Sequence, residues 1–442
     1  SVIDPTSDKL ILAGSFSNLS RKNRVDNVTG LLNKYEFEKA AKDLIQKGVN
    51  FQIMLVNIDD FSRINAIFDR NFGDDVLRIN AQYIQNVLSS AIGVYRLDSD
   101  SFGIIFDNST REEITVIYEM LRSHFSIQQT LKNRKYFFTI SAGCATFDEN
   151  CENFCQIYKN AHTALEYAKK HGKNKLIFFS AQFSNMKLRE LELAEYLRES
   201  IENNFKNFEV FTQPQVDAKT GKLKGGEALL RWHCEKYGAV IPSEFIPILE
   251  ETNLISPVGR WVFETAIKQL KIWVSYLPDF QISINVSYLQ LFDANFVDFI
   301  KQTVEENEVN FDNIVIELTE SRFVTDKELL KNTFIELRQL GINIAMDDFG
   351  VGYSSLEILK EIPADIVKID KAFVKNIRNS SFDMAFVKFV VDLCHNIGIK
   401  VCLEGVEELE EMVAVSDINL DFIQGYLFGK PINDTDFETS HF

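Results

Sequence analysis

The sequence has no uninterrupted apolar run of the length that spans a membrane. Its N-terminus also lacks the basic-then-apolar pattern of a secretory signal. We therefore expect a cytoplasmic chain, which a sensor or membrane segment upstream of residue 1 could tether.

Cysteine and histidine are sparse, with six of each in 442 residues. Cys151 and Cys155 have helical i, i+4 spacing, but no histidine or second cysteine pair completes a zinc-binding pattern. No histidine pairs with a Cys or Ser in a recognisable nucleophile arrangement. We interpret the thiols as reduced and structural, and assign the histidines no chemistry.

Positive charge is in deficit, because 47 Lys and Arg stand against 64 Asp and Glu, a net charge of −17. This balance argues against a surface for DNA, RNA or an anionic membrane. An anionic substrate would need cations that are supplied locally. Hydrophobic residues at 45% and charged residues at 25% describe a soluble globular protein, and the length predicts two domains.

The stretch GINIAMDDFGVGYSSL, residues 341–356, is the strongest single indication of chemistry. An apolar, strand-like run stops at Asp347 and Asp348, a Gly-rich loop follows, and a helix is expected to begin at about Ser354. One of the acids could cap that helix. Two carboxylates at the end of a buried strand are costly unless something positive lies there, so the pattern favours a metal site.

Residues 24–180 alternate between helical and strand patterns, and this order predicts an α+β sandwich with helices over a mainly antiparallel sheet. Residues 1–23 are predicted to be an N-terminal arm or linker, and residues 181–205 a charged connector helix. The predicted strands are residues 51–57, 94–97, 102–106, 136–142 and 175–179, and the predicted helices are 33–47, 73–91, 111–126 and 154–170.

Four segments of this region resemble the GGDEF family of diguanylate cyclases. They are DNVTGLLNKYEFE at 26–38, NIDDFSRINAIFDRNFGDDVL at 57–77, YRLDSDSFGIIF at 95–106 and AKKHGKNK at 168–175. The signature itself is altered, because DSDSF at 98–102 stands where the family has Gly-Gly-Asp-Glu-Phe. Asp98 brings bulk and negative charge to a position where the family's backbone approaches a triphosphate, and Ser101 removes a carboxylate.

Three further positions depart from that family. Asn57 stands for a metal-binding Asp, Ser62 for a phosphate-contacting Lys and Ala66 for a guanine-contacting Asp, whereas Asn65 and Asp100 match. No Arg-x-x-Asp inhibitory site lies just upstream. We therefore predict no cyclase activity and a structural or dimerising domain, with GTP binding as the alternative.

Residues 206–442 repeat strand-like runs and helices, and the runs end at polar residues. Such βα units predict a TIM-type (β/α)8 barrel with its site at the C-terminal strand ends. Each polar residue alone could be a surface acid, a helix cap or a salt-bridge partner, but a mouth crowded with unpaired carboxylates would repel itself. The strand-end residues are Glu227, Asn285, Glu317, Asp347, Asp348, Lys368, Glu404 and Gln424.

The donors in this set are carboxylates and a side-chain amide, without cysteine or a histidine cluster. Such hard oxygen ligands favour Mg²⁺ or Mn²⁺ over Zn²⁺ or copper. The donors exceed what one octahedral ion needs, so we predict two bridged ions, the arrangement suited to phosphodiester cleavage.

Seven segments in this order resemble the EAL family of cyclic di-GMP phosphodiesterases: GGEALLRW, NVSYLQL, IELTES, MDDFGVGYSSL, VKID, LEGVE and IQGYLFGKP. The resemblance implies a barrel with one reversed strand that hydrolyses cyclic di-GMP to linear pGpG. By this resemblance one ion lies among Glu227, Asn285, Glu317 and Asp347, and Asp347 bridges to a second ion near Asp348 and Glu404.

The same resemblance makes Lys368, Glu404 and Asp348 the expected catalytic residues, with Lys368 beside the attacking water and Gln424 helping to hold it. Gln213 and Arg231 match substrate-binding positions.

Two positions concern the loop after the fifth strand. Glu320 matches an acid that steadies this loop, and Val351 replaces the family's usual Thr without loss of a ligand position. Family habit also predicts a homodimer. The alternatives that remain are a non-hydrolysing receptor for cyclic di-GMP or GTP that signals through the connector helix, and a protein-binding scaffold.

Overall fold

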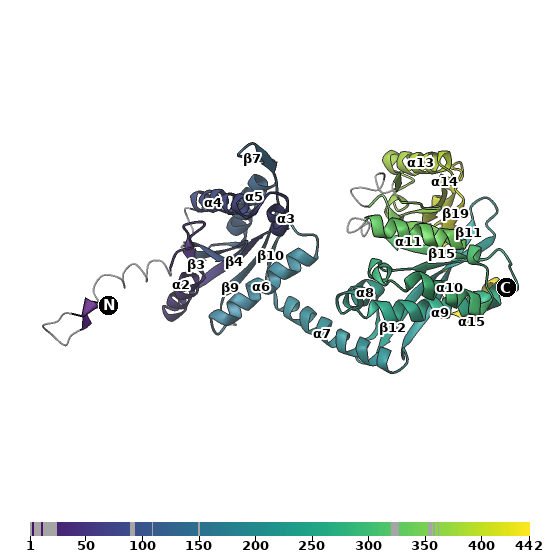
Figure 1. Cartoon of the computed structure of the whole chain (residues 1–442), viewed down its shortest axis with the longest axis horizontal. Coiled ribbons are helices and arrows are strands. Elements are labelled where there is room, and N and C mark those ends of the chain that lie inside the picture. The colour runs from purple at the N-terminus through teal and green to yellow at the C-terminus, as the bar shows by residue number, and fades with distance from the viewer. Residues whose placement is uncertain are drawn as a thin grey trace. The chain divides into compact units, whose positions relative to one another are not determined.

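The structure is a computed structural model of the 442-residue chain. It describes residues 2–3, 10–11, 24–88, 93–107, 109–148, 151–319, 327–351, 356, 359–360 and 362–442, without the side chains of Arg63, Ser184, Thr319 and Lys327. The chain divides into two compact units, Ser1–Arg189 and Glu190–Phe442 (Figure 1). Ahead of the first sheet, β1 (Val2–Ile3) pairs with β2 (Leu10–Ile11).

The N-terminal unit is built on a six-stranded sheet in the order β10-β9-β4-β6-β5-β3. The central β4 is antiparallel to β6 and β9, and only the outer pairs β10–β9 and β3–β5 are parallel. The mainly antiparallel sheet is therefore confirmed. Its strands are β3 (Leu32–Asn33), β4 (Phe51–Ile58), β5 (Gly93–Asp98), β6 (Ser101–Asp107), β9 (Ile140–Phe147) and β10 (Leu176–Phe178).

Helices cover both faces of this sheet, because alternate residues of β4 point to opposite sides. Ile53 and Leu55 pack in one buried cluster with α2 (Lys34–Gln46) and α6 (Phe154–Lys170). Met54 and Val56 pack in the other with helices α4 (Arg70–Val87) and α5 (Arg111–Phe125), and the short α3 (Phe61–Ile67) follows β4. The unit is thus the predicted α+β sandwich.

Residues 136–142 differ from the single strand that the pattern predicts. Tyr136 ends β8 (Arg134–Tyr136), which pairs with β7 (Gln129–Leu131) in a separate hairpin, and β9 begins only at Ile140. Phe137 between them is 67% exposed. The apolar run Tyr-Phe-Phe hides this break, because two of its residues are buried although the ladder stops.

The C-terminal unit is a closed barrel of eight strands, because β11 pairs with both β12 and β19. β11 is antiparallel to both neighbours, and the other neighbouring strands run parallel, so the predicted barrel with one reversed strand is confirmed. A short β13 (Gly238–Val240) extends the sheet beside β12. The barrel strands are β11 (Phe208–Asp217), β12 (Leu223–Cys234), β14 (Gln281–Asn285), β15 (Ile314–Thr319), β16 (Asn343–Phe349), β17 (Ile366–Ile369), β18 (Lys400–Glu404) and β19 (Phe422–Gln424).

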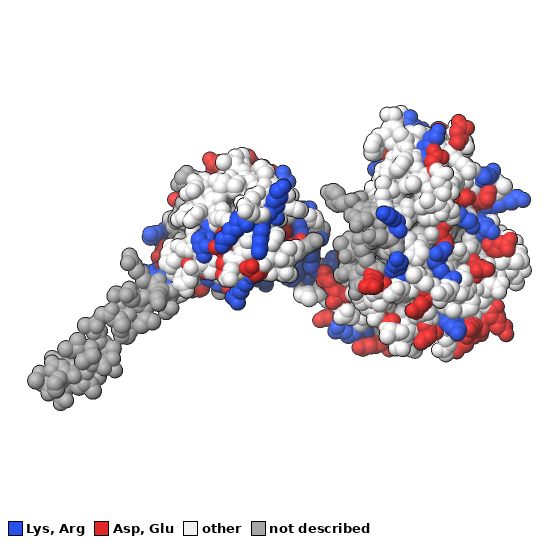
Figure 2. All heavy atoms as spheres, turned by 45° about the horizontal axis from the view of Figure 1, so that its top comes forward, with Lys and Arg blue, Asp and Glu red and all other residues white. Residues whose placement is uncertain are grey.

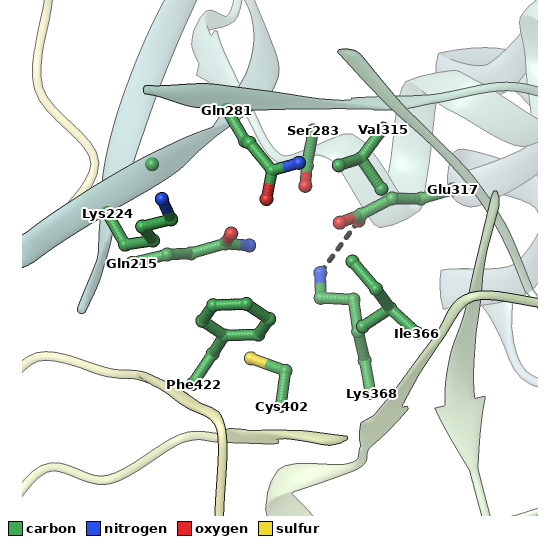
Figure 3. Close-up of a pocket in the computed structure, with 11 residues that line it drawn as sticks. Gln215, Lys224, Gln281, Ser283, Val315, Glu317, Ile366, Lys368, Cys402 and Phe422 are labelled. Atoms are coloured by element: carbon green, nitrogen blue, oxygen red, sulfur yellow. Dashed lines mark hydrogen bonds and ion pairs between the residues drawn. The ribbon is translucent and has the colours of Figure 1, made fainter. Parts of the chain in front are cut away.

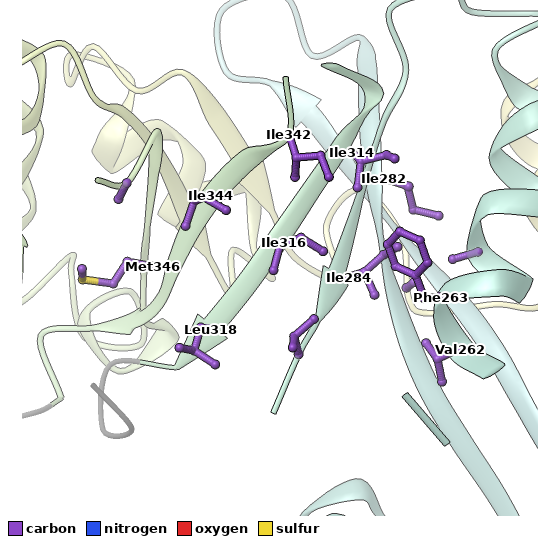
Figure 4. Close-up of a cluster of buried hydrophobic side chains, with 14 of the residues drawn as sticks. Val262, Phe263, Ile282, Ile284, Ile314, Ile316, Leu318, Ile342, Ile344 and Met346 are labelled. Carbon is purple, nitrogen blue, oxygen red and sulfur yellow. The ribbon is translucent and has the colours of Figure 1, made fainter. Parts of the chain in front are cut away.

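Helices surround this barrel and bury the outer face of its strands. On β15, Ile316 and Leu318 point outward into an apolar layer with Phe263 of α9 (Figure 4). Glu317 between them points into the barrel, where it contacts Lys368. The helices are α8 (Pro242–Glu251), α9 (Ile255–Trp273), α10 (Phe296–Asn307), α11 (Lys327–Leu340), α13 (Ser381–Asn396), α14 (Leu409–Val415) and α15 (Asp434–His441), with 3-10 turns η1 (Tyr288–Phe292), η2 (Phe311–Asn313) and η4 (Lys371–Phe373).

The long helix α7 (Ala181–Glu202) contains the division between the two units. Leu193 and Leu197 in its second half are fully buried in the core of the barrel unit. The indole Nε1 of Trp232 on β12 donates to Ser200 Oγ at 3.1 Å. The C-terminal half of α7 therefore packs as part of the barrel unit.

The surface charges and the cysteines agree with the composition of the sequence. Acidic and basic side chains are interspersed over the C-terminal unit on the face shown in Figure 2. All six cysteines are free thiols, as predicted, and Cys155 alone among them is exposed. In the described ranges, no helix combines the length and the apolar character needed to cross a membrane.

Candidate active site

Eight polar side chains meet inside the barrel, one from each barrel strand, and seven of them come from the predicted set. Parallel strands in register place their C-terminal ends at the same mouth, and the ladders pair Asn285 with Glu317 and Glu404 with Gln424. The eight are Gln213 on β11, Glu227 on β12, Asn285 on β14, Glu317 on β15, Asp347 on β16, Lys368 on β17, Glu404 on β18 and Gln424 on β19.

Lys368 lies at the centre of this group. Its side chain is 2% exposed, and Nζ lies 2.9 Å from Glu227 Oε2, 2.7 Å from Glu317 Oε2 and 2.7 Å from Glu404 Oε1. Figure 3 shows the contact between Glu317 and Lys368 among the residues that line a small pocket. Asp347 Oδ1 lies farther away, at 3.8 Å from Nζ. Burial alone would lower the pKa of Lys368, but these carboxylates outweigh it and raise the pKa well above its usual value.

Glu227 holds the best-satisfied carboxylate of the site. Its Oε1 accepts from Asn285 Nδ2 at 2.6 Å, and its Oε2 accepts from Gln424 Nε2 at 2.7 Å as well as from Lys368. Burial favours the protonated acid, but these donors together lower the pKa of Glu227 below its ordinary value. Glu227 is therefore the carboxylate that stays ionised.

The other carboxylates share the one ammonium of Lys368, and their pKa values are shifted upward. Burial raises the pKa of Glu317 well above its usual value, and it raises the pKa of Glu404 to about 8. The pKa of Asp347 is also raised, first by burial and then by the negative charge of Glu227. A single cation cannot neutralise this many buried carboxylates, so the metal-free site favours protonation.

Asp348 interrupts the alternation of β16. Its φ of 57° lies in the left-handed region, and the β16–β17 ladder shifts register between Met346 and Phe349. Adjacent strand residues ordinarily point to opposite faces, so this irregularity lets a second acid stay near the mouth. Partial desolvation and then the neighbouring charges of Asp347 and Asp370 raise the pKa of Asp348 to about 6.

The side chains are chemically suited to divalent cations. Glu317 Oε1 and Asp347 Oδ1 are buried without a hydrogen-bond partner among the described residues. Five carboxylates around one ammonium leave four negative charges, which two divalent cations would balance. The described residues hold no ready-made cluster of three metal-ligating His, Cys, Asp or Glu side chains, because here the carboxylates are turned to Lys368.

The remaining predicted residues occupy the edge of the site or lie outside the described part. Arg231 is half-buried on β12, four residues beyond Glu227, with Nη1 donating to Leu230 O at 3.0 Å. Val351 in the loop after β16 is 63% exposed. Glu320 and the helix expected at Ser354 fall outside the described residues.

Gln215 was missed by the sequence reasoning although it touches the site. Its Nε2 donates to Gln424 Oε1 at 2.8 Å. The signal was present in the sequence, because Gln215 lies two residues after Gln213 on one strand and therefore points to the same face. Nothing in the single sequence marked that face of β11 as the inside of the barrel.

The N-terminal unit also contains a cavity, of about 350 Å³, where its altered signature lies. Asn57 Nδ2 donates to Ser101 Oγ at 2.9 Å, and Asp98 is held by Lys34 Nζ at 2.9 Å. Asn65 Oδ1 is buried without a partner among the described residues. The lining includes Asn57, Asp59, Asp60, Ser62, Asn65, Ser99, Asp100, Lys169 and Lys173.

Comparison with known proteins identifies both units. The sequence model of the EAL domain matches residues 194–431 of the 442-residue chain. The chain belongs to the EAL family. In this EAL protein, residues 23–175 match the model described as diguanylate cyclase, GGDEF domain, so the two domains lie in tandem.

Relatives of this EAL protein share the tandem. It is 28% identical over 428 residues to the bifunctional diguanylate cyclase/cyclic di-GMP phosphodiesterase MucR of Pseudomonas aeruginosa, covering 94% of this chain and 62% of MucR. It is 28% identical over 419 residues to the cyclic di-GMP phosphodiesterase PdeR of Escherichia coli, covering 93% and 62%. The chain thus spans less than two thirds of the length of these relatives.

Solved structures resemble it as well. The PaMucR phosphodiesterase in complex with c-di-GMP is 32% identical with a TM-score of 0.53, covering 56% of this chain and 99% of that one. The S helix-GGDEF-EAL part of Vibrio cholerae LapD, bound to c-di-GMP, has a TM-score of 0.63 at 18% identity, covering 93% and 98%. At that identity the likeness to LapD concerns the fold alone.

Proposed function

We propose that the C-terminal unit is a divalent-metal-dependent phosphodiesterase that hydrolyses cyclic di-GMP to pGpG. The observation that carries this proposal is the cluster of carboxylates around Lys368, in which Glu317 Oε1 and Asp347 Oδ1 have no hydrogen-bond partner among the described residues. The phosphodiesterase names of the EAL relatives support the substrate.

The oxygen donors divide into two groups that share Asp347. Glu227, Asn285, Glu317 and Asp347 would hold one Mg²⁺ or Mn²⁺ ion, and Asp347, Asp348 and Glu404 would hold a second. When bound, such ions lower the pKa of a water and offset negative charge at phosphorus.

The protein's own side chains would position the attacking water and the substrate. Lys368 stays protonated, and once its carboxylate partners turn to metal its N–H groups can hold the attacking water. Glu404 orients the same water, and Gln424 helps to hold it. Arg231 is suited to a phosphate oxygen through its planar pair of donors, and Gln213 to the nucleotide.

The test separates nucleotides after incubation of the protein with cyclic di-GMP and Mg²⁺, Mn²⁺ or EDTA. We expect pGpG with either metal and none with EDTA. Glu227→Ala and Asp347→Ala should abolish hydrolysis in a folded protein, and Glu305→Ala, on the exposed face of α10, should not. Binding of cyclic di-GMP without any product would favour the receptor alternative and overturn the enzyme.

We propose further that the GGDEF domain makes no cyclic di-GMP. Asp98 ends β5 and Ser99 lies in the turn before β6, where the family has its two glycines, and Asn57 replaces a metal-binding carboxylate. Its role would be structural or dimerising, with GTP in its cavity as the alternative, and α7 would carry any signal to the barrel. Incubation with GTP and Mg²⁺ should yield no product. Formation of cyclic di-GMP, as the bifunctional name of MucR describes, would overturn this assignment.

The effect of GTP on the phosphodiesterase tests the two roles of that domain. A rate of cyclic di-GMP hydrolysis that changes with GTP would support the binding alternative. An unchanged rate, together with a dimer in light scattering, would support the structural one.

A further inference from the structure

The reversed strand β11 presents two inward glutamines to its two neighbours. Gln213 lies opposite Glu227 in the β11–β12 ladder, and Gln215 lies opposite Gln424 in the β11–β19 ladder. β11 therefore joins the two strands that close the barrel through side chains as well as through backbone. The three glutamine amides and Glu227 form one hydrogen-bonded chain.

The direction of that chain is set at both of its ends. At one end Gly429 O can only accept, so Gln213 donates its Nε2 to it at 3.2 Å and turns its Oε1 to Gln424. At the other end, Gln424 donates Nε2 to Glu227 Oε2 at 2.7 Å. The Nε2 group of Gln424 therefore donates to both Gln213 and Glu227. Its Oε1 needs a donor from a third residue.

Gln215 supplies that donor, with Nε2 at 2.8 Å from Gln424 Oε1. Gln424 is 5% exposed, so without Gln215 its carbonyl oxygen would be a buried acceptor with no partner. Rotation of the Gln424 amide would not repair this loss, because it would place Oε1 against the carboxylate of Glu227.

We propose that Gln215 is a positioning residue that holds the amide of Gln424, and through it Glu227, in the orientation used for phosphodiester hydrolysis. The inference rests on the proposed function of the barrel mouth. Gln215 itself lies on the inner side, where it lines a small cavity beneath Lys368 with Cys402 and Phe422 (Figure 3). It therefore acts on the reaction through Gln424 and not by contact with the substrate.

The cavity leaves room to replace the Gln215 side chain without a steric clash. The space beneath Lys368 is about 10 Å³, room for about one water. Methionine has nearly the length of glutamine and lacks the donor, so Gln215→Met removes the hydrogen bond without adding bulk. Gln281 lines the same cavity but donates to Asp312 O at 2.9 Å, away from Gln424, and Gln281→Met is the matched control.

The first experiment is a double-mutant cycle on hydrolysis of cyclic di-GMP with saturating Mn²⁺. We expect Gln215→Met to lower kcat about ten-fold with a smaller change in KM, and Gln281→Met to change neither. In a Gln424→Met background, Gln215→Met should add no further loss, because its partner is gone. Independent, multiplying losses in the double variant would overturn the proposal, since they indicate a separate structural role.

A second measurement does not need activity. In metal-free, ¹⁵N-labelled protein, the side-chain amide signals of Gln424 are those lost in Gln424→Met. They should shift in Gln215→Met and stay in place in Gln281→Met. Unchanged Gln424 signals in Gln215→Met would contradict the inference. If the expected shifts occur but the wild-type protein does not hydrolyse cyclic di-GMP, only the proposed function is contradicted.

Discussion

Lys368 shows how one residue sets the state of a whole site. Its ammonium contacts Glu227 and Glu317, which are buried, and Glu404, whose side chain is 18% exposed. Burial raises the pKa of Glu317 and Glu404 despite this ammonium, whereas at Glu227 burial is outweighed by Lys368 and two amide donors, and the pKa falls. The metal-free site is therefore an unbalanced arrangement that either protons or metal ions can relieve.

The first prediction concerns the stability of the metal-free barrel. Glu404, with a pKa near 8 against an ordinary 4.5, holds a proton in the folded state that the unfolded chain has lost. Glu317 is shifted in the same direction. Stability in EDTA should therefore fall as pH rises from about 4.5 to about 8.

Urea unfolding at pH 5.5 and pH 8 checks this trend. All three tryptophans lie in the barrel unit, so their fluorescence follows that unit alone. Saturating Mg²⁺ should flatten the dependence. A metal-free barrel that gains stability between pH 5.5 and 8 would contradict the assigned shifts.

The second prediction removes the shared cation. Lys368→Met leaves its carboxylate partners buried without a counter-charge, so we expect a loss of about 3 kcal/mol in EDTA at pH 8 and less at pH 5.5, where protons replace it. Divalent metal should stabilise this variant more than the wild type, and hydrolysis should be lost. The exposed Lys375→Met is the control, and an equal metal response in both variants would count against a shared site.

At the scale of one element, the end of β16 is held by its packing. Gly350 has a φ of 100°, and a Cβ there would lie 2.7 Å from the rings of both Phe373 and Phe386. These two rings stack at 4.2 Å between centroids. The turn after Asp347 and Asp348 thus lies directly under an aromatic pair from η4 and α13.

The third prediction uses this close approach. Gly350→Ala should lower hydrolysis at least about ten-fold and destabilise the barrel by more than about 1 kcal/mol, because strain and a clash combine. Gly398→Ala, at a φ of 77° with open space around it, should cost only the backbone strain and leave the rate unchanged. Equal effects of the two substitutions on rate would refute the role of the aromatic pair.

At the scale of the whole molecule, the division between units is not at the end of α7 but within it. Leu193 and Leu197 are part of the barrel core, and Ser200 accepts from Trp232. A barrel that begins at residue 206 would lack these contacts.

The fourth prediction compares two shortened chains. Residues 190–442 should fold and retain metal-dependent hydrolysis. Residues 206–442 should lose at least about 3 kcal/mol, since each buried leucine contributes about 1.5–3 kcal/mol. Tryptophan fluorescence in urea measures both chains. Equal stability of the two would show that the second half of α7 is only a connector.

The fold and much of the candidate site could be predicted from the sequence, because both leave local patterns in it. On β15 and β16 an apolar run leads to an acid near the end of the strand, and this pattern can be read without a structure. Glu317 and Asp347 stood out because an acid ends an apolar run. Gln215 did not, because nothing in the single sequence marked its face of β11 as the inside of the barrel.

Sequence by itself determined the two domains, the reversed-strand barrel and the polar residues at the strand ends, because these follow from local periodicity and from motifs. Only the tertiary structure decided that Lys368 lies among the carboxylates and that Gln424 meets Gln213, a residue 211 positions away in the chain. Such contacts depend on how the strands stagger when β11 closes the barrel against β12 and β19. That stagger is a property of all the ladders together, and no single segment encodes it.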